Sequence, residues 1–229
     1  MTLDPAAAVR LSILVGGLST VAALPAALIT AYALARWRFR GRALLSALVM
    51  TPLVLPPVVT GLLLLRALGR GTALGRALDA LGWPVPFTLT GAVIAAVTVG
   101  FPLYVMAIRS AFEAVDPRLE EVSMTLGAPP ARTFLRITLP LALPGVVAGM
   151  VLAFARGLGE FGATAVLAGN MEGRTRTIAL AVYALMDAPD GEPTLRVLLA
   201  ASLGLAAAAL IGFEALNRLS RRRLEIDGG

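Results

Sequence analysis

The stretch DPRLEEVSMTLGAPPARTFLRITLP, residues 116–140, lies between two long apolar runs, and the rest of the chain is interpreted outward from it. Asp116 and Pro117 are typical of a helix start, because aspartate caps free backbone N–H groups and proline is tolerated in the first turn. Gly127 predicts where that helix ends, since glycine readily adopts the left-handed conformation that follows a last turn. The stretch therefore predicts a short polar helix over about 117–126.

Three apolar residues recur at helical spacing within this short helix and form one face: Leu119, Val122 and Leu126. A brief amphipathic helix between two apolar segments suits a groove on a partner protein. The alternative is an ordinary loop helix lying on the lipid headgroups. The pattern alone leaves both interpretations open.

The composition indicates an integral membrane protein. Hydrophobic residues make up 58% of the chain and charged residues 15%, and the mean hydropathy is +0.83. The net charge of +6 comes from arginines that adjoin apolar runs, so membrane topology explains it better than nucleic-acid binding. We expect the lipid bilayer, and no nucleic acid, among the partners.

The sequence contains no cysteine, no histidine and no lysine. Their absence excludes disulfides, thiolate chemistry, serine–histidine pairs and most zinc sites. It also excludes a phosphate-binding P-loop, which needs a lysine. We therefore expect a non-catalytic subunit with no metal or cofactor of its own, and any ATP hydrolysis must belong to another protein.

Five apolar segments are long enough to cross a hydrocarbon core of about 30 Å, which predicts an all-α protein with one transmembrane domain over residues 1–229. They are residues 11–35, 43–65, 87–108, 139–158 and 197–216. Arginines gather at 36–42 and 218–223, which predicts a cytoplasmic location for both clusters, an external N-terminus and a cytoplasmic C-terminus. We expect external connections at 66–86 and 187–193, and two apolar segments too short to span at 161–168 and 177–186.

Two groups within the apolar segments are candidates for a polar path. Pro56 and Pro57, close to Thr60, leave backbone carbonyls free, which suits either the wall of a path or a kink needed only for packing. Arg156 and Glu160 lie four residues apart on one helical face, and charges at membrane depth are costly. They form either an ion pair that fixes the helix end or part of a translocation gate.

The arrangement Glu121-x5-Gly127-x9-Ile137-x-Leu139-Pro140 resembles the signature loop of ABC-importer permeases. The family has two alanines after the glutamate, where this chain has Val122 and Ser123. The resemblance implies a five-span type I ABC-importer permease in which the short cytoplasmic helix couples to an ATPase. The implied coupling residues are Leu119, Glu120, Glu121, Val122, Ser123, Leu126 and Gly127.

A narrower resemblance is to the permease subunit of molybdate ABC importers. It rests on LGEFGAT at 158–164, Gly-Asn at 169–170, Arg-x-Arg-Thr-Ile at 174–178 and TPLVLPPVV at 51–59. Sulfate and tungstate permeases carry a similar Gly-Glu-Phe-Gly stretch, so the anion stays open. The candidates for the gate or pathway are Pro56, Pro57, Thr60, Arg156, Glu160, Phe161, Thr164 and Asn170.

This resemblance implies a homodimer in the plasma (inner) membrane of a bacterium or archaeon. Each copy would bind a cytoplasmic ATPase subunit, which holds ATP and Mg²⁺, and an external or periplasmic binding protein would deliver the oxyanion. Two other classes are an ATP-independent channel or carrier and an intramembrane enzyme. The first leaves the short helix without a role, and the second would need paired carboxylates that the apolar segments lack.

Overall fold

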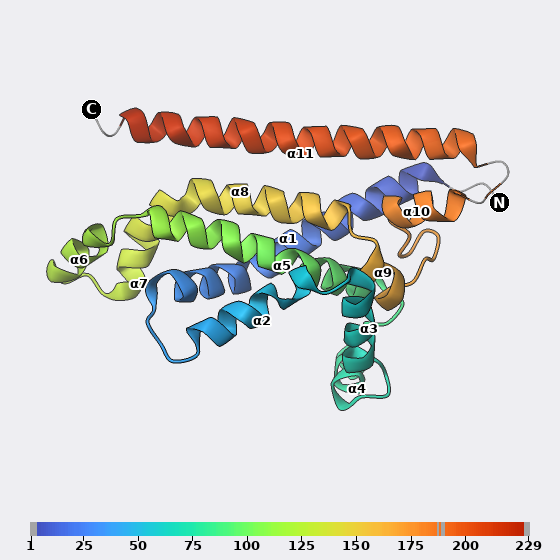
Figure 1. The fold of residues 1–229 in the computed structure, drawn as a ribbon, viewed down its shortest axis with the longest axis horizontal. Helices are drawn as coiled ribbons and strands as arrows, with labels where there is room; N and C mark the ends of the chain where they lie inside the picture. Colours follow the sequence, from blue (N-terminus) through green and yellow to red (C-terminus); the bar gives the residue numbers. More distant parts are fainter. Residues whose placement is uncertain (1–3, 187, 189–190, 227–229) are drawn as a thin grey trace.

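Three long helices, α1 (Pro5–Arg36), α5 (Leu89–Ala114) and α8 (Leu139–Leu158), pack side by side and form the centre of the fold. The fold is that of a computed structural model, which describes residues 4–186, 188 and 191–226, with side chains up to residue 215. A fourth long helix, α11 (Glu192–Ile226), runs beside α8 (Figure 1). The described residues contain no strand, which confirms the predicted all-α class.

The central core lies where α1, α5 and α8 meet. Tyr104, Ile108 and Phe112 of α5 are fully buried there. Most of the fully or nearly buried residues that α1 and α8 contribute to this core are alanines, which let the helix axes approach closely. On α8, a side chain at Gly145 would overlap the Cβ atom of Ala111 on α5, so this contact requires a glycine.

Four described helical segments are long and apolar enough to cross a membrane: Pro5–Arg36, Leu89–Ala114, Pro130–Leu158 and Glu192–Ala215. Two of them contain the expected segments 11–35 and 139–158, and Leu89–Ala114 begins two residues after the expected start of 87–108. The fourth begins before the expected 197–216, and the side chains of the arginines at 218–223 lie outside the described residues. Residues 187, 189 and 190 of the expected external turn at 187–193 also lie outside them.

The segment expected as one span at 43–65 is two helices, α2 (Arg42–Val54) and α3 (Pro57–Leu68), which meet at a bend of 115°. Pro56 and Pro57 cause the bend. Neither has an N–H group to continue the helical ladder, and each proline pushes the residue before it into an extended conformation. A single proline within α1, α5 or α8 does not break its helix, so the consecutive pair makes the difference.

Short helices complete the connections between the long ones. The expected connection at 66–86 contains α4 (Ala73–Ala80), and α3 and α4 project away from the bundle (Figure 1). The expected short apolar segments form α9 (Gly162–Leu167) and α10 (Ile178–Leu185). α6 (Pro117–Thr125) and α7 (Pro130–Thr133) lie between α5 and α8, and a π-helical turn, η1 (Phe134–Thr138), leads into α8.

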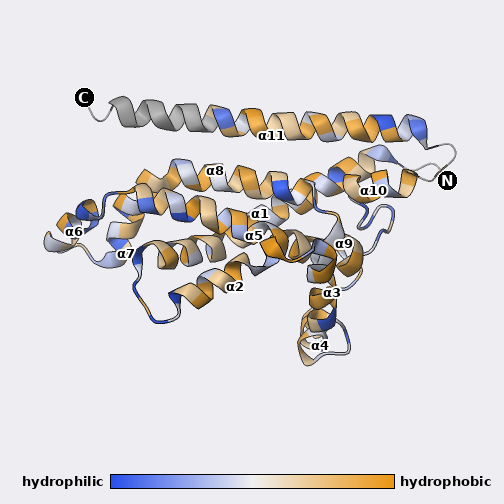
Figure 2. Cartoon of the chain, viewed as in Figure 1, coloured by the Kyte–Doolittle hydropathy of each residue, from blue (hydrophilic) through white to orange (hydrophobic). Residues whose placement is uncertain are grey.

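Hydrophilic residues gather at both ends of the bundle (Figure 2). Hydrophobic residues run along the long helices, whereas hydrophilic residues lie around α6 and the connection from α1 to α2 at one end, and in the loop before α10 and at the start of α11 at the other (Figure 2). The start of α1 and the end of α11 lie at opposite ends of the bundle (Figure 1). The hydrogen bond between Arg36 and Glu120 places α6 at the same end of the bundle as the arginines at 36–42.

Candidate functional site

The helix α6 has a defined start and end. The Asp116 carboxylate accepts a hydrogen bond from the backbone N–H of Arg118 at 2.9 Å. At the other end Gly127 has φ +87°, and the N–H of Ala128 donates to the carbonyl of Ser123 at 3.1 Å. This is the Schellman arrangement, which satisfies carbonyls left free by the last turn. The capping residues identified in the sequence therefore set the limits of α6.

The apolar face of α6 is exposed and borders a groove. Leu119, Val122 and Leu126 keep 46%, 57% and 82% of their surfaces exposed. The groove has a volume of about 580 Å³. It is lined by these three residues and by Ser123, Ala128, Arg136, Ile137, Pro140 and Leu141. An exposed apolar row of this kind suits a partner protein.

Glu120 points the other way from this exposed row and keeps only 9% of its surface exposed. Its carboxylate accepts hydrogen bonds from Arg36 Nε at 3.1 Å and from Thr138 Oγ1 at 2.9 Å. Glu121, in contrast, is exposed. The predicted coupling residues thus divide into an exposed row and one carboxylate turned into the bundle.

Arg156 and Glu160 form an ion pair, which is one of the two alternatives that the sequence left open. Arg156 Nη1 lies 2.9 Å from Glu160 Oε2, and the Glu160 side chain is 2% exposed. The other oxygen, Oε1, accepts a hydrogen bond from the N–H of Ala163 at 2.9 Å. Glu160 therefore ties the end of α8 to the first turn of α9.

The helices α3 and α9 make a close contact that depends on glycine. A Cβ atom at Gly61 would lie 2.8 Å from the Cα atom of Ala163, which leaves no room for a side chain. Thr60, on α3, is buried and its hydroxyl lies 3.4 Å from the Pro56 carbonyl oxygen. Thr164, on α9, is fully buried, and its hydroxyl has no hydrogen-bond partner among the described residues.

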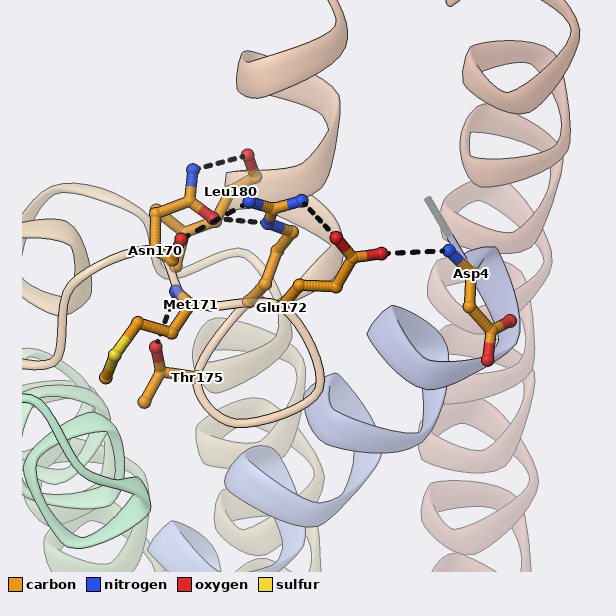
Figure 3. A network of polar contacts seen from close by, with 7 residues as sticks. Asp4, Asn170, Met171, Glu172, Thr175 and Leu180 are labelled. Carbon is orange, nitrogen blue, oxygen red and sulfur yellow. Dashed lines mark hydrogen bonds and ion pairs between the residues drawn. The ribbon is translucent and has the colours of Figure 1, made fainter. Parts of the chain in front are cut away.

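Asn170 lies apart from these residues, in the loop between α9 and α10 (Figure 3). Its side-chain oxygen accepts a hydrogen bond from Arg176 Nε at 2.7 Å. Arg176 Nη1 also contacts Glu172 at 3.5 Å, and Glu172 accepts a bond from the N–H of Asp4 at 3.3 Å. The network holds this loop against the start of α1, so in this conformation Asn170 has a structural role.

The structure therefore gathers the gate candidates into one group and leaves one outside it. Seven of the candidates surround the junction of α3, α8 and α9. They are Pro56, Pro57, Thr60, Arg156, Glu160, Phe161 and Thr164. Within the described residues no three acidic side chains lie together as a metal site would require. Sequence reasoning missed Arg36 and Thr138 as partners of Glu120, because a glutamate in a first helical turn ordinarily faces solvent.

Residues 23–225 match the protein family described as "Binding-protein-dependent transport system inner membrane component". The chain belongs to this family. Its α6, exposed groove and apolar long helices are thus features of an inner-membrane transport component. This result confirms the ABC-permease resemblance of the sequence.

Relatives within the family carry one recurrent name. The "Molybdenum transport system permease protein ModB" of Escherichia coli (strain K12) is 48% identical over 217 residues, covering 94% of this chain and 95% of the relative. The protein of the same name from Haemophilus influenzae is 43% identical over 218 residues, covering 95% of each. That from Mycobacterium tuberculosis is 44% identical over 193 residues, covering 84% and 73%.

Solved structures share the fold. An inward-facing form of the MetNI methionine ABC transporter superposes with a TM-score of 0.68 at 16% identity, covering 94% of both chains. A bacterial ABC transporter for the import of alginate superposes with a TM-score of 0.67 at 20% identity, covering 94% of this chain and 78% of that one. At these identities the likeness supports the type I importer fold.

Proposed function

We propose that this chain is the membrane-spanning permease subunit of an ATP-driven molybdate importer. Two copies would form the translocation path, each bound to a cytoplasmic ATPase subunit, and an external binding protein would deliver the anion. ATP and Mg²⁺ would bind the ATPase, and this chain would bind no cofactor. The names of relatives that are 48% and 43% identical support molybdate as the substrate.

The observation that carries the coupling to an ATPase is α6 with its exposed apolar row. Leu119, Val122 and Leu126 keep between 46% and 82% of their surfaces exposed, at the end of the bundle where Arg36 contacts Glu120. In the complex, these side chains would enter a cleft of the ATPase and lose that exposure. When the paired ATPase subunits close on ATP, the two copies of α6 would be drawn together and the long helices would reorient.

A path between two copies suits the geometry better than a path through one. The core of the single chain is filled by Tyr104, Ile108 and Phe112, all fully buried. Pro56 and Pro57, in contrast, are exposed at the bend between α2 and α3. A two-fold axis beside this bend would place both proline bends along one central path, screened from the hydrocarbon that excludes a dianion.

The substrate is tested by uptake in cells that carry the complete importer. We expect radioactive molybdate to accumulate and unlabelled molybdate to compete with it more strongly than tungstate or sulfate does. Stronger competition by sulfate or tungstate would reassign the substrate within the same class of machine. Uptake that does not depend on the binding protein would count against the importer.

The orientation is tested by thiol labelling, which the absence of native cysteine makes clean. Arg40 lies in the connection from α1 to α2 and Arg174 lies in the loop between α9 and α10, and both are exposed. A membrane-impermeant maleimide should label Arg174→Cys in intact cells and should label Arg40→Cys only after the membrane is opened. The reverse pattern would place α6 outside the cell and refute its coupling to a cytoplasmic ATPase.

A further inference from the structure

Glu120 is a buried carboxylate on a helix whose neighbouring side chains are exposed. It keeps 9% of its surface exposed, whereas Leu119 keeps 46% and Val122 keeps 57%. A carboxylate withdrawn from water is unfavourable unless it is paired and hydrogen-bonded. Its position therefore depends on the groups around it.

Two separate segments contact this carboxylate, and Arg36 connects it to a third. Arg36, the last residue of α1, donates from Nε to Glu120 Oε1 at 3.1 Å, and Thr138 Oγ1 donates to the same oxygen at 2.9 Å. Arg36 Nη2 also donates to the carbonyl of Val115, where α5 ends, at 2.7 Å. We call these four residues, Arg36, Val115, Glu120 and Thr138, the α6 joint.

The α6 joint links α6 to the end of α1 and to the start of α8. Arg36 lies 84 residues before Glu120 in the sequence, so the ion pair connects α6 directly to α1. Thr138 is the last residue of the π-helical turn from which α8 continues, and it is fully buried. π-helical turns within longer helices often occur at functional positions. A displacement of Glu120 thus acts on α1 and α8 together.

The backbone alone gives α6 a less direct connection to α8. After α6 the chain passes Gly127, which has φ +87°, and then Pro129 in an extended conformation before α7 begins. Such an irregular link can change its dihedral angles when α6 is displaced. The side chains of the α6 joint bypass this link.

We propose that the α6 joint transmits the displacement of α6 to α1 and α8, with Glu120 as its central positioning residue. The inference rests on the proposed function, in which an ATPase moves α6. Without the carboxylate, α6 still presents Leu119, Val122 and Leu126 to the ATPase. The ATPase then hydrolyses ATP, but α6 moves relative to α1 and α8 instead of carrying them with it.

The test uses the complete importer in proteoliposomes, with molybdate uptake and ATP hydrolysis measured in the same preparation. Glu120→Gln removes the charge and keeps the size of the side chain. Thr138→Val removes one hydrogen bond and leaves the ion pair in place, so it carries the test if Glu120→Gln does not assemble. The matched control is Glu113→Gln, which neutralises an exposed ion pair with Arg109 on α5.

Mutation of a residue that transmits coupling between two sites changes the strength of that coupling by about 2- to 30-fold. We therefore expect the amount of molybdate moved per ATP hydrolysed to fall about tenfold in Glu120→Gln and about threefold in Thr138→Val. ATP hydrolysis by the assembled complex should stay close to that of the wild type in both variants. Glu113→Gln should keep the wild-type ratio. A purely structural role for Glu120 would lower the yield of complex and leave the ratio unchanged.

Different results would contradict the proposed function and the proposed role of the α6 joint. If the wild-type chain moves molybdate without an ATPase, the proposed function is wrong. The second failure requires a wild type whose transport depends on ATP hydrolysis. If Glu120→Gln and Thr138→Val then assemble and keep the wild-type ratio of molybdate to ATP, the α6 joint does not transmit movement. An equal loss in Glu113→Gln would also overturn the inference, because it would show a general effect of charge.

Discussion

Replacing Leu126 with aspartate tests whether the exposed row of α6 is a docking surface. Leu126 keeps 82% of its surface exposed, and a substitution at such a position changes the free energy of unfolding by at most about 0.5 kcal/mol. Burying a leucine side chain in a partner contributes about 1.5–3 kcal/mol. Since about 1.4 kcal/mol is a factor of ten, the variant should bind the ATPase subunit about 10- to 150-fold more weakly.

The assay is a titration of the purified ATPase subunit onto the chain in lipid nanodiscs, with membrane insertion measured in parallel. Met124→Asp is the matched control, because Met124 is 44% exposed on the same helix and does not line the groove. We expect normal insertion for both variants and weakened ATPase binding for Leu126→Asp alone. Wild-type affinity in Leu126→Asp, or equal weakening by both substitutions, would refute the docking surface.

Two further predictions concern the junction of α3, α8 and α9. Arg156→Ala leaves Glu160, 2% exposed, without its ion-pair partner; a buried charge left unpaired costs about 3–5 kcal/mol, so the thermal midpoint of the purified chain should fall. An unchanged midpoint would show that the pair is incidental. Gly61→Val forces a side chain against Ala163 and should destabilise the chain by about 1–3 kcal/mol, measured by thermal unfolding in detergent. Gly71→Ala, where no atom lies within 4 Å of the added carbon, is the control, and an equal effect of both would contradict the close contact.

The sequence predicted the elements whose boundaries are set by local chemistry. Asp116 and Gly127 cap α6 in the structure as their residue types indicate. The spacing of Arg156 and Glu160 placed them on one face of a helix and made an ion pair one of two alternatives, and the structure contains that pair. At Pro56 and Pro57 the sequence predicted free backbone carbonyls within one continuous span. It did not predict that the two prolines together divide the span into two helices with a bend of 115°.

The parts that the sequence did not predict depend on contacts between distant segments. Nothing in the local pattern around Glu120 distinguishes it from Glu121, yet one is buried and the other is exposed. The difference comes from Arg36, whose place beside α6 depends on how α1 packs against α5. Asn170 is a similar case. Its hydrogen bond with Arg176 forms because the loop between α9 and α10 turns and brings the two side chains together.

The most direct test of ATP-driven transport through α6 is molybdate uptake by the purified chain in liposomes, with and without the ATPase subunit. With the ATPase, the binding protein and ATP present, molybdate should accumulate against its gradient, and omission of the ATPase should abolish uptake. Uptake by the chain alone, at the same rate with and without ATP, would show that the protein is a channel or carrier and that α6 is not the point of coupling.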